Sequence, residues 1–187
     1  PLPGKLAFSR DLFVLLFLLR GMPFVDLAFL RRCDLQGNVI TYHRRKTSRK
    51  LTVVVGKEAM EIIQKYMYTI PDSPYLFPII QNPGKDEYGQ YARMLRLQNY
   101  RLTQVANILG IRDRLSTYTA RHTWATTALR QNYNSSLICD AMGHSSVKVT
   151  ETYFQPYRDD EVNRMNSSLI TYILSKKKRG TDKKIRS

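Results

Sequence analysis

Hydrophobic residues recur at helical spacing along most of the chain, beginning with the apolar run LFVLLFLL at residues 12–19. Charged residues bound this run, and it is far shorter than the roughly 20 residues that a membrane-spanning helix needs. It therefore predicts a core helix over Ser9–Leu19. Gly21 and Pro23 interrupt the pattern before a second helical stretch, FVDLAFLRR at residues 24–32.

Two later runs are rich in β-branched and aromatic residues. They are VITYHRR at residues 39–45 and KLTVVV at residues 50–55, separated by a short polar segment. This pattern predicts a β-hairpin, with a turn at DLQGN before its first strand.

Helical spacing returns after the hairpin, with a Pro- and Gly-rich loop at residues 73–89. Pro71 and Gly110 end the first two helices, Ser135 or Ser136 can cap the last, and Gly143 can end it. The predicted helices cover residues 57–69, 91–111 (one helix or two), 119–132 and 136–142. The fold class is thus mainly α with a small antiparallel β-sheet (α+β), without internal repeats.

The charge of the chain favours a polyanionic partner. Lys and Arg number 30 against 15 Asp and Glu, a formal net charge of +15 over 187 residues. Such an excess attracts nucleic acid, a membrane surface being the weaker alternative. A merely basic surface is the plainer interpretation, because part of the excess lies in the tail SKKKRGTDKKIRS. We expect one domain over residues 1–174 and a disordered basic tail over 175–187.

The cysteines and the chain start limit the setting. Cys33 and Cys139 are far apart and show no CxxC spacing, so we expect neither a zinc site nor a disulfide, two buried thiols, and a reducing cytoplasm. No secretory signal is visible, and the start PLPGK lacks a methionine, which suggests a fragment of a longer protein.

Several residues could serve attack on a phosphodiester. Such a reaction needs a nucleophile, donors to the phosphate oxygens and an acid for the leaving alkoxide. Arg121 and His122 are expected at the start of a helix, where an anion is favoured. His144 follows a glycine at a helix end, and Lys46 lies at the hairpin tip. Taken alone, each has a more ordinary interpretation: Arg121 as a surface ion-pair partner, His122 as a structural donor to backbone, and Lys46 as solvated charge.

The order of these residues changes the interpretation. Three segments together resemble the catalytic domain of tyrosine recombinases, the phage-type integrase family. They are TARHTWATTALRQN, LICDAMGHSSVKVTETYF and RRKT. In that family an Arg-His pair opens a helix, Leu-Gly-His follows, and a nucleophilic Tyr comes nine residues after that His. Met142 replaces the Leu, Gly143 and His144 match, Thr150 matches a usual Thr, and Tyr153 is nine residues on. RGMPFVDLAFL and ARHTWAT look most like integrases of Bacteroides-type mobile elements.

The resemblance implies a role for each matching residue. Tyr153 would form a 3′-phosphotyrosyl link, Arg121 and His144 would bind the phosphate, and Lys46 would protonate the 5′-hydroxyl. The resemblance implies double-stranded DNA as the partner and no metal or other cofactor. It implies a homo-tetramer in the synaptic complex, although this fragment could be a monomer. The implied location is the bacterial cytoplasm, in association with the nucleoid. Further DNA-binding residues are expected at Arg44, Arg45, Arg49 and Lys148.

Two departures from the family pattern stand out. Tyr118 replaces the usual His three residues before Arg121, so the proton-relay role is weaker, moved to Tyr118 or filled by another group. Pro23 stands where the first catalytic Arg is expected. Arg20, about one helical turn earlier, is the preferred substitute, Arg31 or Arg32 being less favoured, and Asp26 would support an arginine without touching DNA.

Beyond the motif, a nearly helical apolar stripe could dock on a neighbouring subunit or on its own domain. Its members are Val162, Met165, Leu169, Ile170 and Ile173. The resemblance also implies that amino-terminal DNA-clamping domains are absent from this fragment. The expected function is site-specific recombination for the integration or excision of a mobile element. The alternatives are a type IB topoisomerase, a hairpin resolvase and a basic DNA-binding module that does not cleave.

Overall fold

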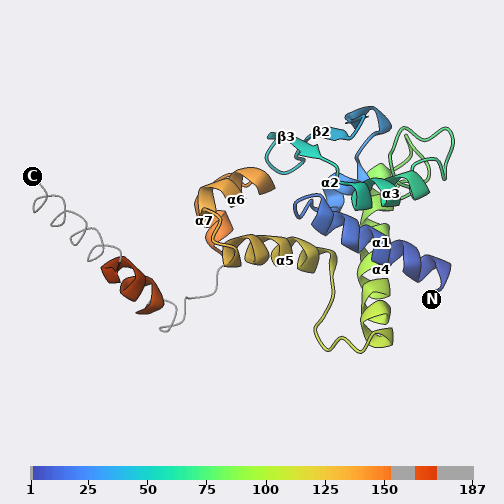
Figure 1. Ribbon diagram of the computed structural model, residues 1–187. Coiled ribbons are helices and arrows are strands. Elements are labelled where there is room, and N and C mark those ends of the chain that lie inside the picture. The colour runs from blue at the N-terminus through green and yellow to red at the C-terminus, as the bar shows by residue number, and fades with distance from the viewer. Residues whose placement is uncertain (1, 153–162, 172–187) are drawn as a thin grey trace, which may run out of the picture. The chain divides into compact units, whose positions relative to one another are not determined.

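The computed structural model describes residues 2–152 and 163–171 (Figure 1). The chain divides into two compact units, Pro1–Tyr153 and Phe154–Ser187, and each is treated by itself. In the second unit, residues 163–171 form a helix whose Met165, Leu169 and Ile170 are exposed. Within the described ranges no helix has the length and apolar character to cross a membrane.

The elements of the first unit follow a mainly helical order with one small sheet, as predicted. In chain order they are α1 (Gly4–Leu18), α2 (Phe24–Ala28), a 3₁₀ turn η1 (Arg32–Asp34), β1 (Leu35–Gln36), β2 (Val39–His43), β3 (Lys50–Val54), α3 (Lys57–Tyr66), α4 (Glu87–Ile108), α5 (Thr117–Arg130), α6 (Ser135–Met142) and α7 (Val147–Glu151).

Helix α1 lies at the centre of the core and packs against α3, α4 and α5. Leu12, Leu15 and Leu16 of this helix and Leu19 at its C-cap are at most 1% exposed. They have the i, i+3, i+4, i+7 spacing of one helix face. The prediction of a core helix from the LFVLLFLL run is confirmed. The helix ends where Arg20 and Gly21 take left-handed backbone, with φ of 60° and 66°.

The second helix is shorter than predicted. Helix α2 ends at Ala28, because the next residues pair with a distant segment instead of continuing the helix. The Leu30 carbonyl accepts from Leu76 N–H, and Arg32 N–H donates to the Pro74 carbonyl. The preference of residues 24–32 for a helix is overridden by these long-range bonds.

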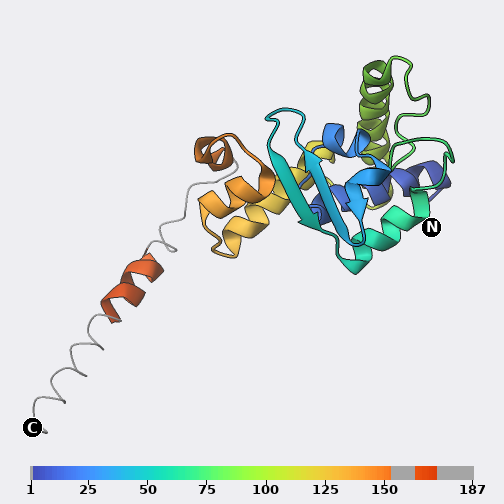
Figure 2. The same cartoon turned by 90° about the horizontal axis from the view of Figure 1, so that it is seen from above.

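The predicted hairpin forms, and a short third strand extends it. The antiparallel order is β1-β2-β3, with Ile40 opposite Val53 and Tyr42 opposite Leu51. Figure 2 shows β2 and β3 side by side, with the loop that joins them projecting beyond the sheet. Ile40, Tyr42 and Val53 are buried, so the even-numbered side chains of β2 face the core.

The remaining helices are close to the predictions, with three differences. The segment predicted as one helix or two over residues 91–111 forms one helix, α4, which starts earlier, at Glu87, and ends at Ile108. The side chain that caps α6 is Asn134, whose Oδ1 accepts from Ser136 N–H, so the prediction of a Ser135 or Ser136 cap is wrong. Gly143 ends α6 with φ 64°, as predicted. Helix α7 was not predicted.

The two cysteines differ in environment. Cys139 is buried in α6, as expected, whereas Cys33 is exposed in the 3₁₀ turn, so the expectation of two buried thiols is wrong for Cys33. The predicted tail over residues 175–187 and the residues Val162 and Ile173 of the apolar stripe lie outside the described residues.

Candidate active site

Arg121 is buried on the inner face of α5, where it links three segments of the chain. Its side chain donates through Nη1 to the Gly21 carbonyl and through Nη2 to the Met142 carbonyl. The residue is only 4% exposed. Because α5 begins at Thr117, Arg121 lies in the second turn, and the expectation that it opens the helix beside free N–H groups is wrong.

His144 lies directly beside Arg121. Its Nε2 is 2.6 Å from Nη2 of Arg121, and its Nδ1 is 2.7 Å from Oγ1 of Thr150. A guanidinium can only donate, so Nε2 accepts and the proton resides on Nδ1, which donates to Thr150. Burial, followed by the charges of Arg121, Arg44 and Lys46, lowers the pKa of His144 to about 4. The imidazole is therefore neutral at pH 7.

Arg44 and Asp26 form a second buried pair next to this cluster. Nη1 of Arg44 donates to the carbonyls of Met142 at 3.1 Å and Gly143 at 2.8 Å. Its Nε lies 3.6 Å from Oδ2 of Asp26. Both residues are buried, Arg44 at 7% and Asp26 at 3% exposed. Asp26 thus supports an arginine, as expected, and that arginine is Arg44.

Asp26 also fixes the backbone of the hairpin. Its Oδ1 accepts from the Arg45 N–H at 3.0 Å. Burial raises the pKa of the Asp26 carboxyl, although the Arg45 hydrogen bond and the charge of Arg44 oppose the rise. A buried carboxylate of this kind needs its positive partners to remain ionised.

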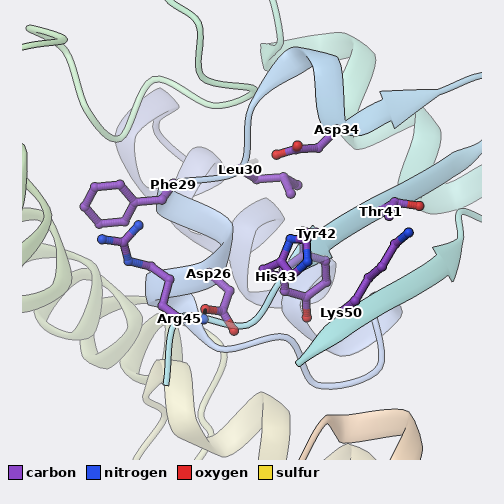
Figure 3. A pocket seen from close by; sticks show the side chains of 9 residues that line it. All are labelled: Asp26, Phe29, Leu30, Asp34, Thr41, Tyr42, His43, Arg45 and Lys50. Carbon is purple, nitrogen blue, oxygen red and sulfur yellow. Dashed lines mark hydrogen bonds between the residues drawn. The ribbon is translucent and has the colours of Figure 1, made fainter. Parts of the chain in front are cut away.

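The hairpin loop carries the other basic candidates. Lys46 is exposed in the turn that joins β2 and β3. Arg45 directs its guanidinium over the Phe29 ring, 3.8 Å from the centroid, away from the Asp26 carboxylate (Figure 3). Arg45, Phe29 and Asp26 are among the residues that line an open cavity of about 320 Å³ between α2 and β2, and Lys46 is not among them. Arg49 pairs with Asp140 at 2.9 Å.

Arg20 faces a different group from the one the sequence suggested. Its Nη1 donates to the Thr52 carbonyl of β3 at 3.2 Å. The positive charges that lower the pKa of His144 are those of Arg121, Arg44 and Lys46, and Arg20 is not among them. Arg44, not Arg20, is the arginine whose side chain shares an acceptor, the Met142 carbonyl, with Arg121.

The remaining candidates lie on exposed surfaces. Tyr118, 59% exposed, and His122 lie on α5, and Lys148 is exposed on α7. Tyr153 lies outside the described residues, two positions after the last residue of α7. Thr150, which bonds His144, is fully buried and precedes Tyr153 by three positions in the chain.

Sequence reasoning placed Arg44 among surface DNA contacts and so missed its buried position. A signal was present, because side chains alternate along a strand and residues 40 and 42 are apolar or aromatic core positions. The same alternation places residue 44 on the inner face. A buried arginine there requires an acidic partner, and Asp26 meets that need.

The cluster can bind an oxyanion. Two guanidinium groups and a neutral imidazole converge from the end of β2, α5 and the turn after α6. The charge of the exposed Lys46 also acts on the His144 ring. Guanidinium donors match pairs of phosphate oxygens, and a partly desolvated setting strengthens their attraction for negative charge. With a hydroxyl nucleophile, such a site could transfer a phosphoryl group.

The chain is similar in sequence to known tyrosine recombinases. The chain is 26% identical over 167 residues to tyrosine recombinase XerC of Thermodesulfovibrio yellowstonii, an alignment that covers 82% of this chain and 52% of that protein. It is 32% identical over 60 residues to a tyrosine recombinase of Pseudothermotoga lettingae, which covers 32% of this chain and 21% of that protein. The chain therefore spans about half the length, or less, of these relatives.

Solved structures share the fold at low sequence identity. The Tn1549 transposon integrase, in complex with a circular intermediate DNA, superposes with a TM-score of 0.63 at 18% identity, over 90% of this chain and 65% of that one. The XerA recombinase gives a TM-score of 0.60 at 19% identity, over 89% and 64%. The model of the phage integrase family matches residues 5–159, and the chain belongs to that family.

Proposed function

We propose that this chain is the catalytic domain of a site-specific DNA recombinase that cleaves and rejoins strands through a 3′-phosphotyrosyl link on Tyr153. The observation that carries the proposal is the buried contact of Arg121 with His144, at 2.6 Å, beside Arg44 and Asp26. The guanidinium groups of Arg121 and Arg44 are both buried and share the Met142 carbonyl as an acceptor, so they lie close together. Guanidinium groups bind phosphate oxygens in pairs, and a DNA phosphate is the anion that such a cluster would bind.

The cleavage step divides among these residues. The Tyr153 phenolic oxygen bonds to phosphorus as the bond from phosphorus to the 5′-oxygen breaks, and the electron pair stays on that oxygen. Arg121 and Arg44 donate to the non-bridging oxygens, and His144 lies beside them. Lys46 gives a proton to the departing 5′-oxygen. Attack by the 5′-hydroxyl of a second strand reverses the step and joins new partners.

Arg44 is the better candidate for the second guanidinium, in place of Arg20. No described residue accepts a hydrogen bond from Nη2 of Arg44, so that donor is available to a phosphate oxygen. Arg20 is engaged with the Thr52 carbonyl. The Pro23 departure from the family pattern is then compensated from β2, with Asp26 as the counter-charge.

DNA binding and assembly follow from the surface. The exposed basic residues Arg45 and Lys148 favour a duplex, and their contacts would weaken with salt. The exposed apolar residues Met165, Leu169 and Ile170 support association of copies into a homo-tetramer on DNA. The enzyme would then integrate or excise a mobile element in the bacterial cytoplasm, at the nucleoid.

The test is a covalent trap with the complete gene product. Nicked duplexes covering the DNA that flanks the gene are incubated with protein, denatured and digested, and adduct peptides are identified by mass spectrometry. We expect a nucleotide on Tyr153, and Tyr153→Phe should abolish it while DNA affinity stays within about 2-fold. DNA binding without any adduct would instead favour a module that does not cleave. Transfer between two labelled duplexes separates recombination from a topoisomerase.

The arginine assignment has its own comparison. Arg44→Ala should lower the adduct rate at least 100-fold, of the order seen when one transition-state donor is lost. Arg20→Ala should lower it less than 5-fold. Thermal melting checks that both variants are folded. A larger loss in Arg20→Ala than in Arg44→Ala would reverse the assignment.

A further inference from the structure

The loop that joins β2 and β3 is attached to the turn after α6 by three of its side chains. Besides the two bonds from Arg44, Oγ1 of Thr47 donates to the Gly143 carbonyl at 3.3 Å. Arg49 donates through Nη1 to the His144 carbonyl at 3.4 Å and through Nη2 to Asp140 at 2.9 Å. We call this set of contacts from Arg44, Thr47 and Arg49 to residues 140–144 the clasp.

The clasp supplies hydrogen-bond donors to the carbonyls at the end of α6. The last carbonyls of a helix lack internal partners, and they attract positive charge. In α6 the carbonyls of Met142 and Gly143 receive their donors from the hairpin loop. The approach is close: a Cβ at Gly143 would lie 2.8 Å from Cδ1 of Leu51 and 3.1 Å from Cδ of Arg44. The loop and the turn therefore hold each other in one arrangement.

In the sequence, Lys46 lies between two residues of the clasp, Arg44 and Thr47. Its own side chain is exposed, so its position depends on the anchored residues on either side. On the other side of the clasp, the His144 ring continues the connection through Nδ1 to the buried Thr150 of α7 at 2.7 Å. Thr150 precedes Tyr153 by three residues in the chain.

We infer that Thr47 and Arg49 are positioning residues, which hold the Lys46 ammonium at the distance from the His144 turn that protonation of the leaving 5′-oxygen requires. This inference rests on the proposed function and adds to it a role for two residues that touch no reacting atom. Arg49 then acts through Asp140 and the His144 carbonyl, and not as the DNA contact that its charge alone suggests.

A change of leaving group tests this role. When sulfur replaces the bridging 5′-oxygen at the scissile phosphate, the thiolate departs without needing a proton, so loss of the acid matters little. Adduct formation is timed for the complete gene product on oxygen and sulfur duplexes that carry the site mapped by the covalent trap. The variants are Arg49→Ala, Thr47→Val, Asp140→Ala and Lys46→Ala, with Lys57→Ala as control for losing one exposed positive charge.

On the oxygen duplex, Arg49→Ala should slow adduct formation about 100-fold, as expected for a misplaced catalytic group. On the sulfur duplex it should come within about 3-fold of wild type, as Lys46→Ala does, and DNA affinity should match that of Lys57→Ala. Asp140→Ala should lose rate on the oxygen duplex in the same way, and the double variant with Arg49→Ala should lose no more than the worse single variant.

Two results would overturn the inference. Equal losses of Arg49→Ala on both duplexes would assign Arg49 to the phosphate or to the fold, and unchanged rates on both would remove any role. Thr47→Val and Asp140→Ala keep the test decisive should Arg49→Ala fail to fold. Failure of the proposed function has a different signature: wild-type protein would give no adduct on either duplex.

Discussion

The side chains around α1 and those around Arg121 are buried to a similar degree, but different forces hold them. Leu12, Leu15 and Leu16 are fully buried among other apolar side chains. Arg121 and His144, at 4% and 5% exposed, lie among carbonyls and charges. Burial of apolar area stabilises the first region, at about 25 cal/mol per Å². The second is stabilised only while each polar atom keeps its partner.

This difference separates stability from chemistry. The apolar region is destabilised by a cavity, but its stability depends on how well the side chains fill the space and not on specific polar partners. The polar region has residual unmet groups, among them Oδ2 of Asp26 and Nε of Arg44, which face each other at 3.6 Å without a hydrogen bond. Buried polar atoms without a hydrogen-bond partner are rare in proteins, and a catalytic role is one of the reasons for which they occur. Substitutions should therefore affect the two regions in different measurements.

The largest expected effect on stability is in the apolar region. Leu16→Ala leaves a cavity between α1 and its neighbours and should lower the free energy of unfolding by about 2–5 kcal/mol. Urea unfolding measures it. The adduct rate per folded molecule should stay within about 2-fold, since no site contact is removed. A stability loss under 1 kcal/mol would contradict the central place of α1 in the core.

In the polar region, the expected effect is a dependence of the free energy of unfolding on pH. The folded pKa of His144 is about 4, against 6.5 for the free group. Its neutral form therefore contributes stability that is complete above pH 6.5 and is lost as the pH falls toward 4. At about 1.4 kcal/mol per pKa unit, the loss over that window is on the order of 3 kcal/mol. Other groups titrate there too, so wild type is compared with His144→Asn.

Urea unfolding at pH 7.5, 6.5, 5.5 and 4.5 gives both curves. The wild-type free energy of unfolding should fall more steeply than that of His144→Asn below pH 6.5. Parallel curves would mean that His144 takes up its proton equally readily in the folded and unfolded protein, which an Nε2 that accepts from Arg121 does not allow.

The sequence predicted the apolar region better than the polar one, for a physical reason. The period of Leu12, Leu15, Leu16 and Leu19 is a local property, so α1 could be found from the chain alone. The polar contacts join residues about 100 positions apart, such as Arg121 with Gly21 and Arg44 with Gly143. Spacing along the chain carries no distance information for such pairs.

The motif gave the identities of Arg121 and His144 but not their settings. It could not show that Arg44 faces inward beside Asp26, because the first catalytic arginine was sought near Pro23, along the chain, and not across the sheet. Likewise, α2 ends early only because Leu30 and Arg32 bond to residues 74–76. These features depend on long-range contacts, so they could be found only from the folded structure.

Gly21 joins the two regions and should give a smaller effect on stability. It ends α1 with φ +66°, and a Cβ there would lie 3.1 Å from Cα of Arg121. Gly21→Ala should cost about 1–2 kcal/mol for the left-handed backbone. It should also displace Arg121 and slow adduct formation about 10-fold or more, since small misplacements at a catalytic site are costly.

Gly37→Ala is the matched control for that substitution. Gly37 has a similar φ of +59°, but no atom lies within 4 Å of a Cβ placed there. The two variants should lose comparable stability, and only Gly21→Ala should lose adduct rate. Equal rates in both variants would show that the contact with Arg121 is not needed to place it.

The smallest expected effect on stability is at the Arg49–Asp140 pair of the clasp. The side chains are 42% and 65% exposed, and such pairs contribute about 0–1 kcal/mol, less at high salt. Arg49→Ala should thus melt within about 2 °C of Lys57→Ala, although its adduct rate on the oxygen duplex falls about 100-fold. A core residue has the reverse signature, because it stabilises the fold without aligning a proton donor. If Arg49→Ala instead destabilised the protein as much as Leu16→Ala, the clasp would belong to the structural part of the molecule.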